Sequence, residues 1–476
     1  MEKTLSAQVL TQLPPVDTAA VDALLSREIA ADPTKFIVLD DDPTGVQTVH
    51  DVSVYTDWSV ESICSGLSEP GKLFYILTNS RGLTAAETTA VHREIAAHIT
   101  AAAERTGIRY LIISRSDSTL RGHYPLETEL LRQGMEAAGR RVDGEILCPF
   151  FREGGRFTIG NVHYVRYGDQ LVPAAQTEFA RDATFGYTHS DLPGYIEEKT
   201  GGRYKACDVT CISLEELRAQ DYDGILRKLE AVTGFGKVCV NAADECDVKV
   251  FAVALYRAMA RGKTFLFRTA AGFVKVVGGI TDIPLLTRRD MVTADTGTGG
   301  LVVVGSHTQK TTHQLEELLK LPCTVPIAFQ SDLVLQGEAA LSAEVDRCVA
   351  LEEAAMEAGK VAVCFTSRKL LTVENDTRES ALTRSVRISQ AVQSLVGRLQ
   401  VTPAFLIAKG GITSSTIGTE ALGVKKARVL GQICPGIPVW QTDGASKFPQ
   451  IPYVIFPGNV GDADTLRQAV EILMAE

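Results

Sequence analysis

The alternation of short apolar runs with longer helical stretches constrains the fold of this chain more than any other feature of its sequence. Runs of three to five mostly apolar residues recur along the whole chain, and most are followed by Gly, Asp, Ser or Thr. Helical stretches separate many of them, for example residues 85–105, 214–232 and 379–399. Because short apolar runs are typical of buried parallel strands, the alternation predicts an α/β fold with mainly parallel sheets flanked by helices.

Twelve strands are expected from this pattern. They are residues 36–39, 73–77, 110–114, 145–148, 237–240 and 264–267 in the first part of the chain, and 301–304, 326–329, 361–365, 405–408, 438–440 and 453–456 in the second. Residues 156–204 have little periodicity, which indicates an excursion from the main sheet.

The length of the chain predicts two domains, since 476 residues exceed the usual domain size of about 100–200 residues. Residues 284–300 are rich in Thr, Asp and Gly and have no apolar period, which is typical of a linker. We therefore expect an N-terminal extension (1–35), a first domain (36–284), a linker (285–300) and a second domain (301–476), with the active site in the cleft between the two domains.

Charge and cysteine content exclude several functions. The 48 basic and 58 acidic residues give a net charge of −10, which argues against nonspecific binding to nucleic acid or to an anionic membrane. The chain has neither a signal peptide pattern at its start nor an apolar run of about 18 residues. Its ten cysteines are scattered, so we expect neither a disulfide framework nor a zinc site. These features predict a cytoplasmic protein.

Polar loops follow four of the expected strands in the first domain, at residues 40–45 (DDDPTG), 78–82 (TNSRG), 114–123 (SRSDSTLRGH) and 149–163. In open parallel sheets, ligands bind outside the carboxyl ends of the strands, so these loops are expected to meet. Adjacent carboxylates suit cation binding or general-base catalysis, and arginine holds a carboxylate or phosphate in a bidentate fork. The loops therefore predict a pocket for a small, hydroxylated, anionic molecule.

Each of these loops also has a purely structural interpretation. Asp40 or Asp42 could accept backbone N–H bonds in a turn, and Arg115 and Arg121 could belong to an exposed, ion-paired turn. His163 could bind the substrate or make a structural hydrogen bond. It is the presence of five arginines in the loops that favours anion binding.

Three glycine-rich turns follow strands of the second domain, at residues 305–308, 409–416 and 457–464. Glycine allows close approach of phosphate oxygens to the backbone, and the following helix N-terminus carries about half a positive charge. One such turn is explained by backbone requirements alone, whereas three at neighbouring strand ends favour phosphate binding. The chain lacks the P-loop motif and has no G-x-G-x-x-G after a strand, so a P-loop or dinucleotide site is not expected.

Taken together, these motifs resemble the four-carbon acid sugar kinase family over about residues 36–466. The family's Asp-Asp-x-Thr-Gly, Asp-Ser-Thr-Leu-Arg-Gly, Gly-Arg-x-Thr-x-Gly and Thr-Glu-Phe-x-Arg-Asp loops correspond to residues 41–45, 117–122, 155–160 and 177–182. Its Gly-Ser, Gly-Gly-x-Thr and Gly-Asn-x-Gly turns correspond to residues 305–306, 410–413 and 458–461.

The resemblance implies a first domain that binds the sugar acid and a second domain that binds ATP. The implied reaction is phosphorylation of a hydroxyl group of a four-carbon sugar acid (threonate, erythronate or a 3-oxo-tetronate), with ATP and Mg²⁺ as cofactors. The residues expected to act are Asp42 and Asp117 in catalysis; Asp41, Thr44, Arg81, Arg121, Arg156 and His163 in substrate binding; and Ser306, Gly410, Gly411, Ile412, Thr413, Gly458 and Asn459 in nucleotide binding. Metal ligands stay unknown, and a homodimer is one alternative for the assembly.

Two residues depart from the family pattern. Ile412 stands where members of known activity usually carry Glu, and His123 stands where they usually carry Asn. The fold and ATP use are expected to survive these changes, but the identity of the substrate does not follow. Two other interpretations stay open. One is a hydroxy-acid lyase or isomerase with an Asp-based metal site and a cofactor such as coenzyme A, and the other is a non-catalytic metabolite-binding protein.

Overall fold

All twelve apolar runs form strands in the computed structural model, which describes residues 2–293, 296–306, 308–368, 371, 373, 378–458 and 460–475. The chain folds into two compact units, Met1–Gly45 with Asp57–Asp282, and Val46–Thr56 with Ile283–Glu476. The predicted α/β class with two mainly parallel sheets is confirmed. The segment Val46–Thr56, which the sequence analysis assigned to the first domain, belongs to the second unit.

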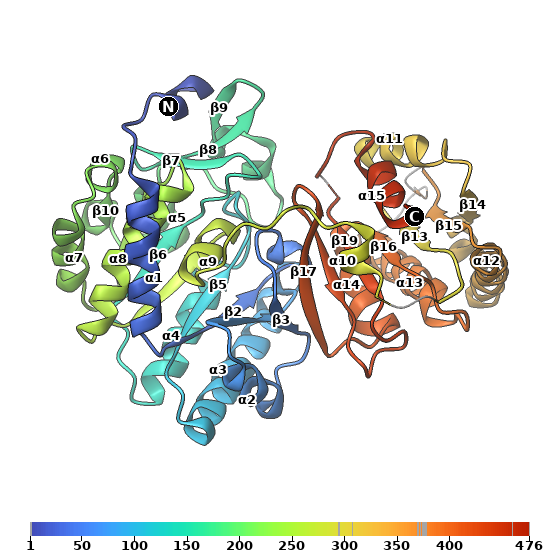
Figure 1. Ribbon diagram of the computed structural model, residues 1–476, viewed down its shortest axis with the longest axis horizontal. Helices are drawn as coiled ribbons and strands as arrows, with labels where there is room; N and C mark the ends of the chain where they lie inside the picture. Colours follow the sequence, from blue (N-terminus) through green and yellow to red (C-terminus); the bar gives the residue numbers. More distant parts are fainter. Residues whose placement is uncertain are drawn as a thin grey trace. The chain divides into compact units, whose positions relative to one another are not determined.

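The main sheet of the first unit has seven parallel strands. Their spatial order is β10 (Thr210–Ile212), β11 (Gly236–Val240), β6 (Gly144–Cys148), β12 (Phe265–Thr269), β5 (Tyr110–Arg115), β2 (Lys35–Asp40) and β4 (Leu73–Leu77). Helices α2 (Val60–Ser68), α3 (Ala85–Thr106) and α4 (Leu126–Ala137) pack together on one face of the sheet. Helices α1 (Thr18–Ala31), α7 (Tyr222–Ala231), α8 (Glu245–Ala260) and α9 (Ala271–Val277) cover the other (Figure 1).

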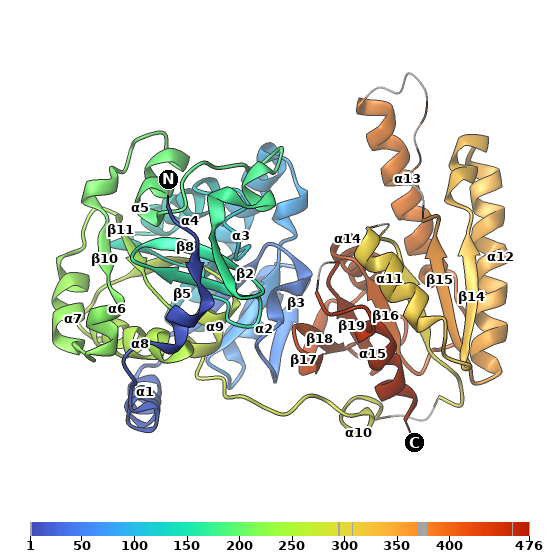
Figure 2. The same cartoon turned by 90° about the horizontal axis from the view of Figure 1, so that it is seen from above.

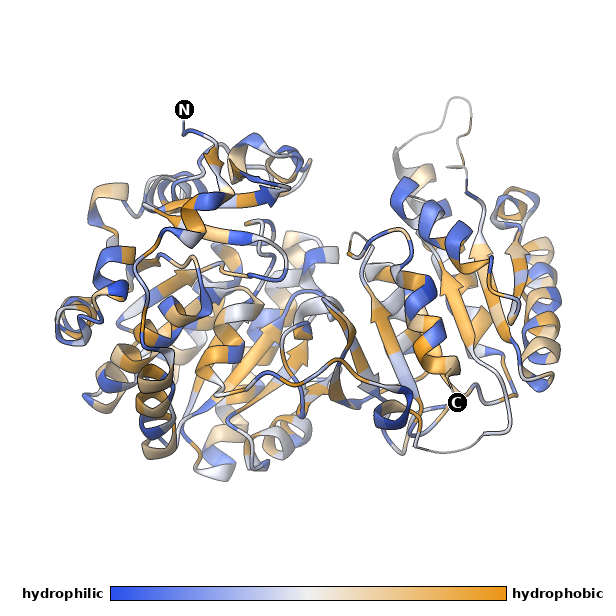
Figure 3. Cartoon of the chain, turned by 45° about the horizontal axis from the view of Figure 1, so that its top comes forward, coloured by the Kyte–Doolittle hydropathy of each residue, from blue (hydrophilic) through white to orange (hydrophobic). Residues whose placement is uncertain are grey.

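Helix α3 illustrates how local sequence defines an element. Thr84 and Glu87 form a capping box at its start, and Gly107 ends it with a φ of +69°, a conformation that glycine adopts without strain. The buried residues recur at helical spacing at Thr88, His92, Ile95, Ala96, Ile99 and Ala102. This stripe faces the sheet, whose central strands are apolar on both sides because helices cover both faces (Figure 3).

A small antiparallel sheet accounts for the predicted excursion. It has the order β1 (Leu5–Ser6), β9 (Gln170–Pro173), β8 (Val162–Tyr167) and β7 (Arg156–Ile159). The N-terminal extension is part of the first unit, since β1 pairs with β9 and helix α1 packs on α8. A short helix, α5 (Leu192–Lys199), follows this sheet, and α6 (Leu214–Arg218) follows β10.

The second unit has a sheet of mixed direction. Strands β19 (Pro452–Phe456), β16 (Leu406–Lys409), β13 (Leu301–Val304), β15 (Val361–Thr366) and β14 (Thr324–Phe329) are parallel, and β18 (Ile437–Gln441), β17 (Lys426–Cys434) and β3 (Val52–Tyr55) extend them in antiparallel pairs. Helices α11 (Gln309–Leu318) and α15 (Thr465–Met474) pack together. On the other face lie α12 (Glu338–Glu357), α13 (Arg378–Gly397) and α14 (Gly411–Thr416) (Figure 2).

The expected linker, residues 285–300, contains one short helix, α10 (Arg288–Met291). Its residues Leu286 and Met291 join the hydrophobic core of the second unit. None of the helices in the described parts of the chain has the length and apolar character that crossing a membrane requires.

Candidate functional site

The acidic loop and the Ser-Asp-Ser-Thr loop lie at a topological switch point of the first sheet. Strands β2 and β5 are neighbours, with Asp40 opposite Arg115 at their carboxyl ends. After β2 the chain passes through β3 of the second unit and returns to β4 on one side of β2, and after β5 it continues toward β6 on the other side. In open α/β sheets, ligands bind where adjacent strands diverge in this way. The two predicted loops are therefore brought together at a position suited to a ligand.

Two carboxylates of the acidic loop are buried and paired with arginines. Asp40 accepts a hydrogen bond from Arg115 at 3.1 Å, and Asp41 accepts two from Arg81 at 2.6 and 3.2 Å. Burial raises the pKa of Asp40 to about 7 against the effect of Arg115, and it also raises the pKa of Asp41. A Cβ atom at Gly45 would lie 1.9 Å from an Asp40 oxygen, so this turn requires glycine.

Asp42 and Asp117, the predicted catalytic pair, are both held ionised. Burial alone would raise the pKa of each group, but neighbouring donors outweigh it and the pKa of each lies below its usual value. Asp42 Oδ1 accepts from the Thr44 N–H at 2.8 Å and from the Thr44 hydroxyl at 2.5 Å. Asp117 Oδ2 accepts from Arg121 Nε at 2.7 Å and from the Thr119 hydroxyl. No hydrogen bond to Asp117 Oδ1 is present among the described residues.

Arg156 differs from the other arginines of these loops. Its guanidinium lies 5.5 Å from the centre of the Phe179 ring, and that of Arg121 lies 5.0 Å from the same ring. Within the described part of the chain, Arg156 has no ion pair, and its buried Nε has no hydrogen-bond partner. Burial lowers the pKa of Arg156, and the charge of Asp117 acts in the opposite direction. Arg156 is thus a cation whose hydrogen-bonding capacity is free for a ligand.

His163 lies behind the site and not at its surface. Its side chain is fully buried, with Nδ1 at 3.0 Å from the Thr158 hydroxyl and Nε2 at 2.8 Å from the Ser118 carbonyl oxygen. Burial lowers the pKa of His163 to about 4, so the ring is neutral near pH 7. These contacts favour a positioning role, in which His163 fixes the backbone beside Asp117, over the substrate contact expected from the sequence.

A buried network of hydrogen bonds, which sequence analysis missed, holds the loops from inside the first unit. Arg268, at the carboxyl end of β12, donates to the Glu127 carboxylate and, at 3.3 Å, to the Arg121 carbonyl oxygen. Glu127 also accepts from the Ser80 hydroxyl at 2.5 Å. The arginine in the otherwise apolar strand Phe-Leu-Phe-Arg-Thr was the available sequence signal, because a charge at such a position must be paired.

The first two glycine turns of the second unit meet at another switch point. Strands β13 and β16 are neighbours, and the chain leaves them in opposite directions. A Cβ atom at Gly305 would lie 2.2 Å from the Thr413 hydroxyl, and one at Gly410 would lie 3.5 Å from Ser306 Cβ. Gly410 has a φ of +122°, which side chains rarely allow. The predicted residues Ser306, Gly410, Gly411 and Thr413 therefore lie together at the start of helix α14.

Lys409 joins the second and third turns. Its side chain is fully buried, and Nζ donates to the carbonyl oxygens of Pro457 at 2.5 Å and Gly458 at 3.3 Å. Burial lowers the pKa of Lys409 to about 7. All three predicted turns are thus connected at the carboxyl ends of β13, β16 and β19. The predicted residue Asn459 lies outside the described residues.

The side chains of Ile412 and Arg368 also lie at the glycine turns. Ile412, the departure from the family pattern, is 73% exposed and leaves the surface of the turn apolar where a carboxylate is usual in the family. Arg368, which the sequence analysis did not single out, donates to the Ser306 carbonyl oxygen at 2.7 Å from the end of β15. Burial lowers the pKa of Arg368. Arg368 therefore positions the first turn, as Lys409 positions the second and third turns.

The residues present fit a nucleotide better than a protein-held metal ion. No side chain in the described part of the chain caps helix α14 at Gly410, and an uncapped helix start after a glycine turn is an arrangement that receives phosphate groups. No group of three or more His, Cys, Asp or Glu side chains with metal-binding geometry occurs among the described residues. Mg²⁺ is commonly held by substrate phosphates, waters and one or two carboxylates, so a nucleotide site does not require such a cage.

Both domains of the chain match known protein domains. Residues 36–277 match a model described as a sugar-binding N-terminal domain, and residues 301–466 match one described as a nucleotide-binding C-terminal domain. The protein therefore has the domain content of a kinase-like enzyme. It belongs to the four-carbon acid sugar kinase family, as the sequence motifs predicted.

Two solved structures share the fold at low sequence identity. The chain superimposes on a protein from Salmonella typhimurium LT2, whose structure is presented as that of a proposed tRNA synthase, with 17% identity, a TM-score of 0.64, and coverage of 92% of this chain and 99% of the other. It also superimposes on Haemophilus influenzae protein HI1011, with 18% identity, a TM-score of 0.59, and coverage of 92% and 100%. Comparison with curated proteins gave no match.

Proposed function

We propose that the protein transfers a phosphoryl group from ATP to a hydroxyl group of a four-carbon sugar acid of the threonate, erythronate or 3-oxo-tetronate type. The free guanidinium of Arg156 carries this proposal. It lies among loops whose other arginines are already paired with carboxylates of the protein. A substrate carboxylate supplies the missing partner, because guanidinium and carboxylate form bidentate charge-assisted hydrogen bonds.

Asp117 is our proposal for the group that orients or deprotonates the attacking hydroxyl. Its Oδ2 is held by Arg121 and Thr119, so the carboxylate is fixed in orientation while Oδ1 stays available. Asp42 is the second candidate, with 20% of its side chain exposed, Thr44 holding Oδ1 and Arg81 donating to Oδ2 at 3.3 Å. Phosphoryl transfer asks the protein mainly for positioning and charge stabilisation, which two fixed, ionised carboxylates and an arginine supply.

In the second unit, Ser306, Gly410, Gly411 and Thr413 are proposed to hold the phosphate groups of ATP, which supplies the transferred phosphoryl group when bound. Lys409 and Arg368 donate to loop carbonyl oxygens, so we propose that they position these turns without contacting the nucleotide. Mg²⁺ is proposed to bridge the phosphates, as in other phosphoryl transfer reactions.

A screen for ADP release tests the proposal. The full-length protein is incubated with ATP, Mg²⁺ and each of the four-carbon sugar acids, and each acid is paired with the polyol that has a CH₂OH group in place of the carboxylate. We expect ADP release with at least one acid and much slower release with its polyol. Conversion of an acid without ATP would support a lyase or isomerase instead. Binding of nucleotide and acid with no ADP release would support a metabolite-binding protein.

A further inference from the structure

A pocket lies at the end of the first sheet opposite to the acidic loops. It is lined by residues at the amino ends of β5, β6 and β12, and its volume is about 770 Å³, within the range of small-molecule sites. Strand β5 runs from Tyr110 at this pocket to Arg115 at the acidic loops. Six residues of a strand span roughly 17 Å. A molecule in this pocket is therefore separate from a substrate bound beside Arg156.

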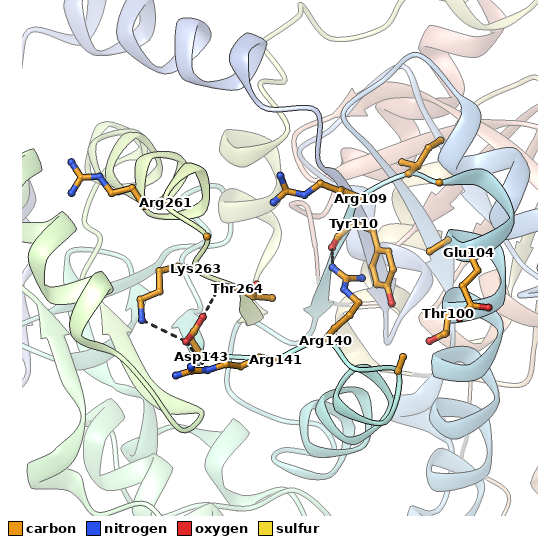
Figure 4. A pocket seen from close by; sticks show the side chains of 15 residues that line it. Thr100, Glu104, Arg109, Tyr110, Arg140, Arg141, Asp143, Arg261, Lys263 and Thr264 are labelled. Atoms are coloured by element: carbon orange, nitrogen blue, oxygen red, sulfur yellow. Dashed lines mark hydrogen bonds and ion pairs between the residues drawn. The ribbon is translucent and has the colours of Figure 1, made fainter.

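The pocket is strongly basic in a protein that is acidic overall. Five cationic side chains line it, against two carboxylates, Glu104 and Asp143. The cations are Arg109, Arg140, Arg141, Arg261 and Lys263 (Figure 4). The lining thus has a net charge of +3, whereas the whole chain has a net charge of −10.

Helix ends explain only part of this charge. Helices α3, α4 and α8 end beside the pocket, at Thr106, Ala137 and Ala260. Each helix C-terminus carries roughly half a negative charge, which attracts cations. Three such ends offset about 1.5 charges. Arg261 also pairs with Glu230 at 2.7 Å, outside the pocket lining, so about half a positive charge remains without compensation by neighbouring groups.

One carboxylate forms ion pairs with two of the cations on one side of the pocket. Asp143 lies 3.2 Å from Arg141 and 3.5 Å from Lys263, and it also accepts a hydrogen bond from the Thr264 N–H at 3.0 Å. Lys263 donates in addition to the Val232 carbonyl oxygen at 2.7 Å. These contacts fix both cations in place without neutralising both.

The other side of the pocket has a fixed arginine and a free one. Arg140 lies over the ring of Tyr110, 3.8 Å from its centre, and donates through Nη2 to the Tyr110 carbonyl oxygen at 2.7 Å. The side chain of Arg109 forms no hydrogen bond or ion pair with any described residue. Figure 4 shows Arg109 and Arg140 on one side and Lys263 and Arg141 on the other.

We propose that this pocket is a second ligand site, which binds a small phosphate-bearing anion with more than one anionic group. Cations on two sides of a cavity of this size favour such a ligand over a single phosphate ion, because both sides gain a partner. Arginine forks match phosphate oxygens in bidentate pairs. The proposal does not depend on the function proposed for the acidic loops.

Hydrogen exchange of the full-length protein with pyrophosphate as the probe tests this site locally. We expect slower amide exchange in residues 104–110, 138–143 and 261–264 at millimolar pyrophosphate, compared with sodium chloride of equal ionic strength. The double variant Arg109→Gln with Arg141→Gln should raise the pyrophosphate concentration for half-maximal protection at least about tenfold. The matched control is Arg105→Gln, an exposed arginine of α3 outside the pocket that pairs with Glu61.

Three results would overturn the proposal. One is the absence of protection in these segments, or protection confined to the second unit. Another is equal protection in the double variant, provided that its free energy of unfolding in urea matches that of the control. The third is stronger protection by citrate than by pyrophosphate at equal ionic strength, since that would show a preference for carboxylates.

Discussion

Replacing Arg156 by Met tests the proposed substrate contact most directly. Met keeps an unbranched side chain that can pack against Phe179, but it removes the charge and both forks of the guanidinium. Hydrogen bonds to charged groups contribute about 1.5–3 kcal/mol each, and the site is partly exposed, so we take about 3 kcal/mol for the bidentate pair. That loss corresponds to about a hundredfold decrease in kcat/KM for the sugar acid.

Folding should be little affected by Arg156→Met, because the side chain has no ion pair among the described residues and its buried Nε has no partner. Met also removes the buried Nε group, and a buried donor without a partner costs about 1–3 kcal/mol. Arg152→Met is the matched control, since Arg152 lies in the same loop, is 45% exposed and, among the described residues, forms ion pairs with Glu153 and Asp244, each at 3.7 Å. Arg156→Lys keeps the charge without the fork and should recover part of the loss.

The assay compares the acid with its matching polyol in both proteins by coupled ADP release. The wild type should prefer the acid by about the factor that Arg156→Met loses, and the variant should show almost no preference. The cycle of two proteins and two substrates isolates the contact between guanidinium and carboxylate. An equal decrease for acid and polyol, or an unchanged kcat/KM for the acid, would refute the assignment of Arg156.

Three more predictions concern the rest of the molecule. Asp117→Asn should lower kcat by about 10²–10⁴-fold with ATP affinity unchanged by calorimetry, and a near-normal kcat would remove Asp117 from the role of base. Gly410→Ala should weaken ATP binding at least about fivefold, because a side chain at a φ of +122° costs about 1–3 kcal/mol; equal affinity in calorimetry would contradict the phosphate site. Glu352 is fully buried, neither of its carboxylate oxygens has a hydrogen-bond partner among the described residues, and burial raises its pKa from 4.5 to about 8. The folded state therefore binds more protons than the unfolded state between these values, so its contribution to stability is lost as pH rises from about 4.5 to about 8. Urea titrations should show Glu352→Gln to be less sensitive to pH in that window than the wild type, and identical pH profiles would contradict the pKa shift.

The strands buried on both faces could be predicted because their composition alone identifies them. Strand β17 was missed although its burial alternates along Lys-Ala-Arg-Val-Leu-Gly-Gln-Ile-Cys, the period-two pattern of an antiparallel strand with one exposed face. Such strands contain no continuous apolar run, so the pattern used to predict the buried strands does not include them. Strand β3 is a different case. It belongs to the second unit because Val52–Tyr55 pairs with β17, more than 370 residues later, and no local pattern encodes that pairing.

The positions of the polar loops could likewise be predicted, because strand ends fix where loops of a parallel sheet meet. The partners of each side chain could not. Asp41 pairs with Arg81 across 40 positions, and Arg268 reaches Glu127 across 141 positions. Such pairs depend on the order of strands in the sheet and on which side chains burial forces together. For the same reason, His163 was assigned to the substrate although burial directs both ring nitrogens to the protein.

The arginine pairings also explain why composition could not identify the cation that we propose to bind the substrate. Around the acidic loops the structure has six carboxylates and five guanidiniums: Asp40, Asp41, Asp42, Asp117, Asp182 and Glu127 with Arg81, Arg115, Arg121, Arg156 and Arg268. Counted together, these charges sum to −1 and predict no affinity for an anion. Four of the guanidiniums, however, are paired with protein carboxylates, and only Arg156 in this set is not. If selectivity for a sugar acid resides in this one guanidinium, then removing a neighbouring pair as a whole should alter loop stability more than selectivity, whereas changing Arg156 should alter selectivity alone.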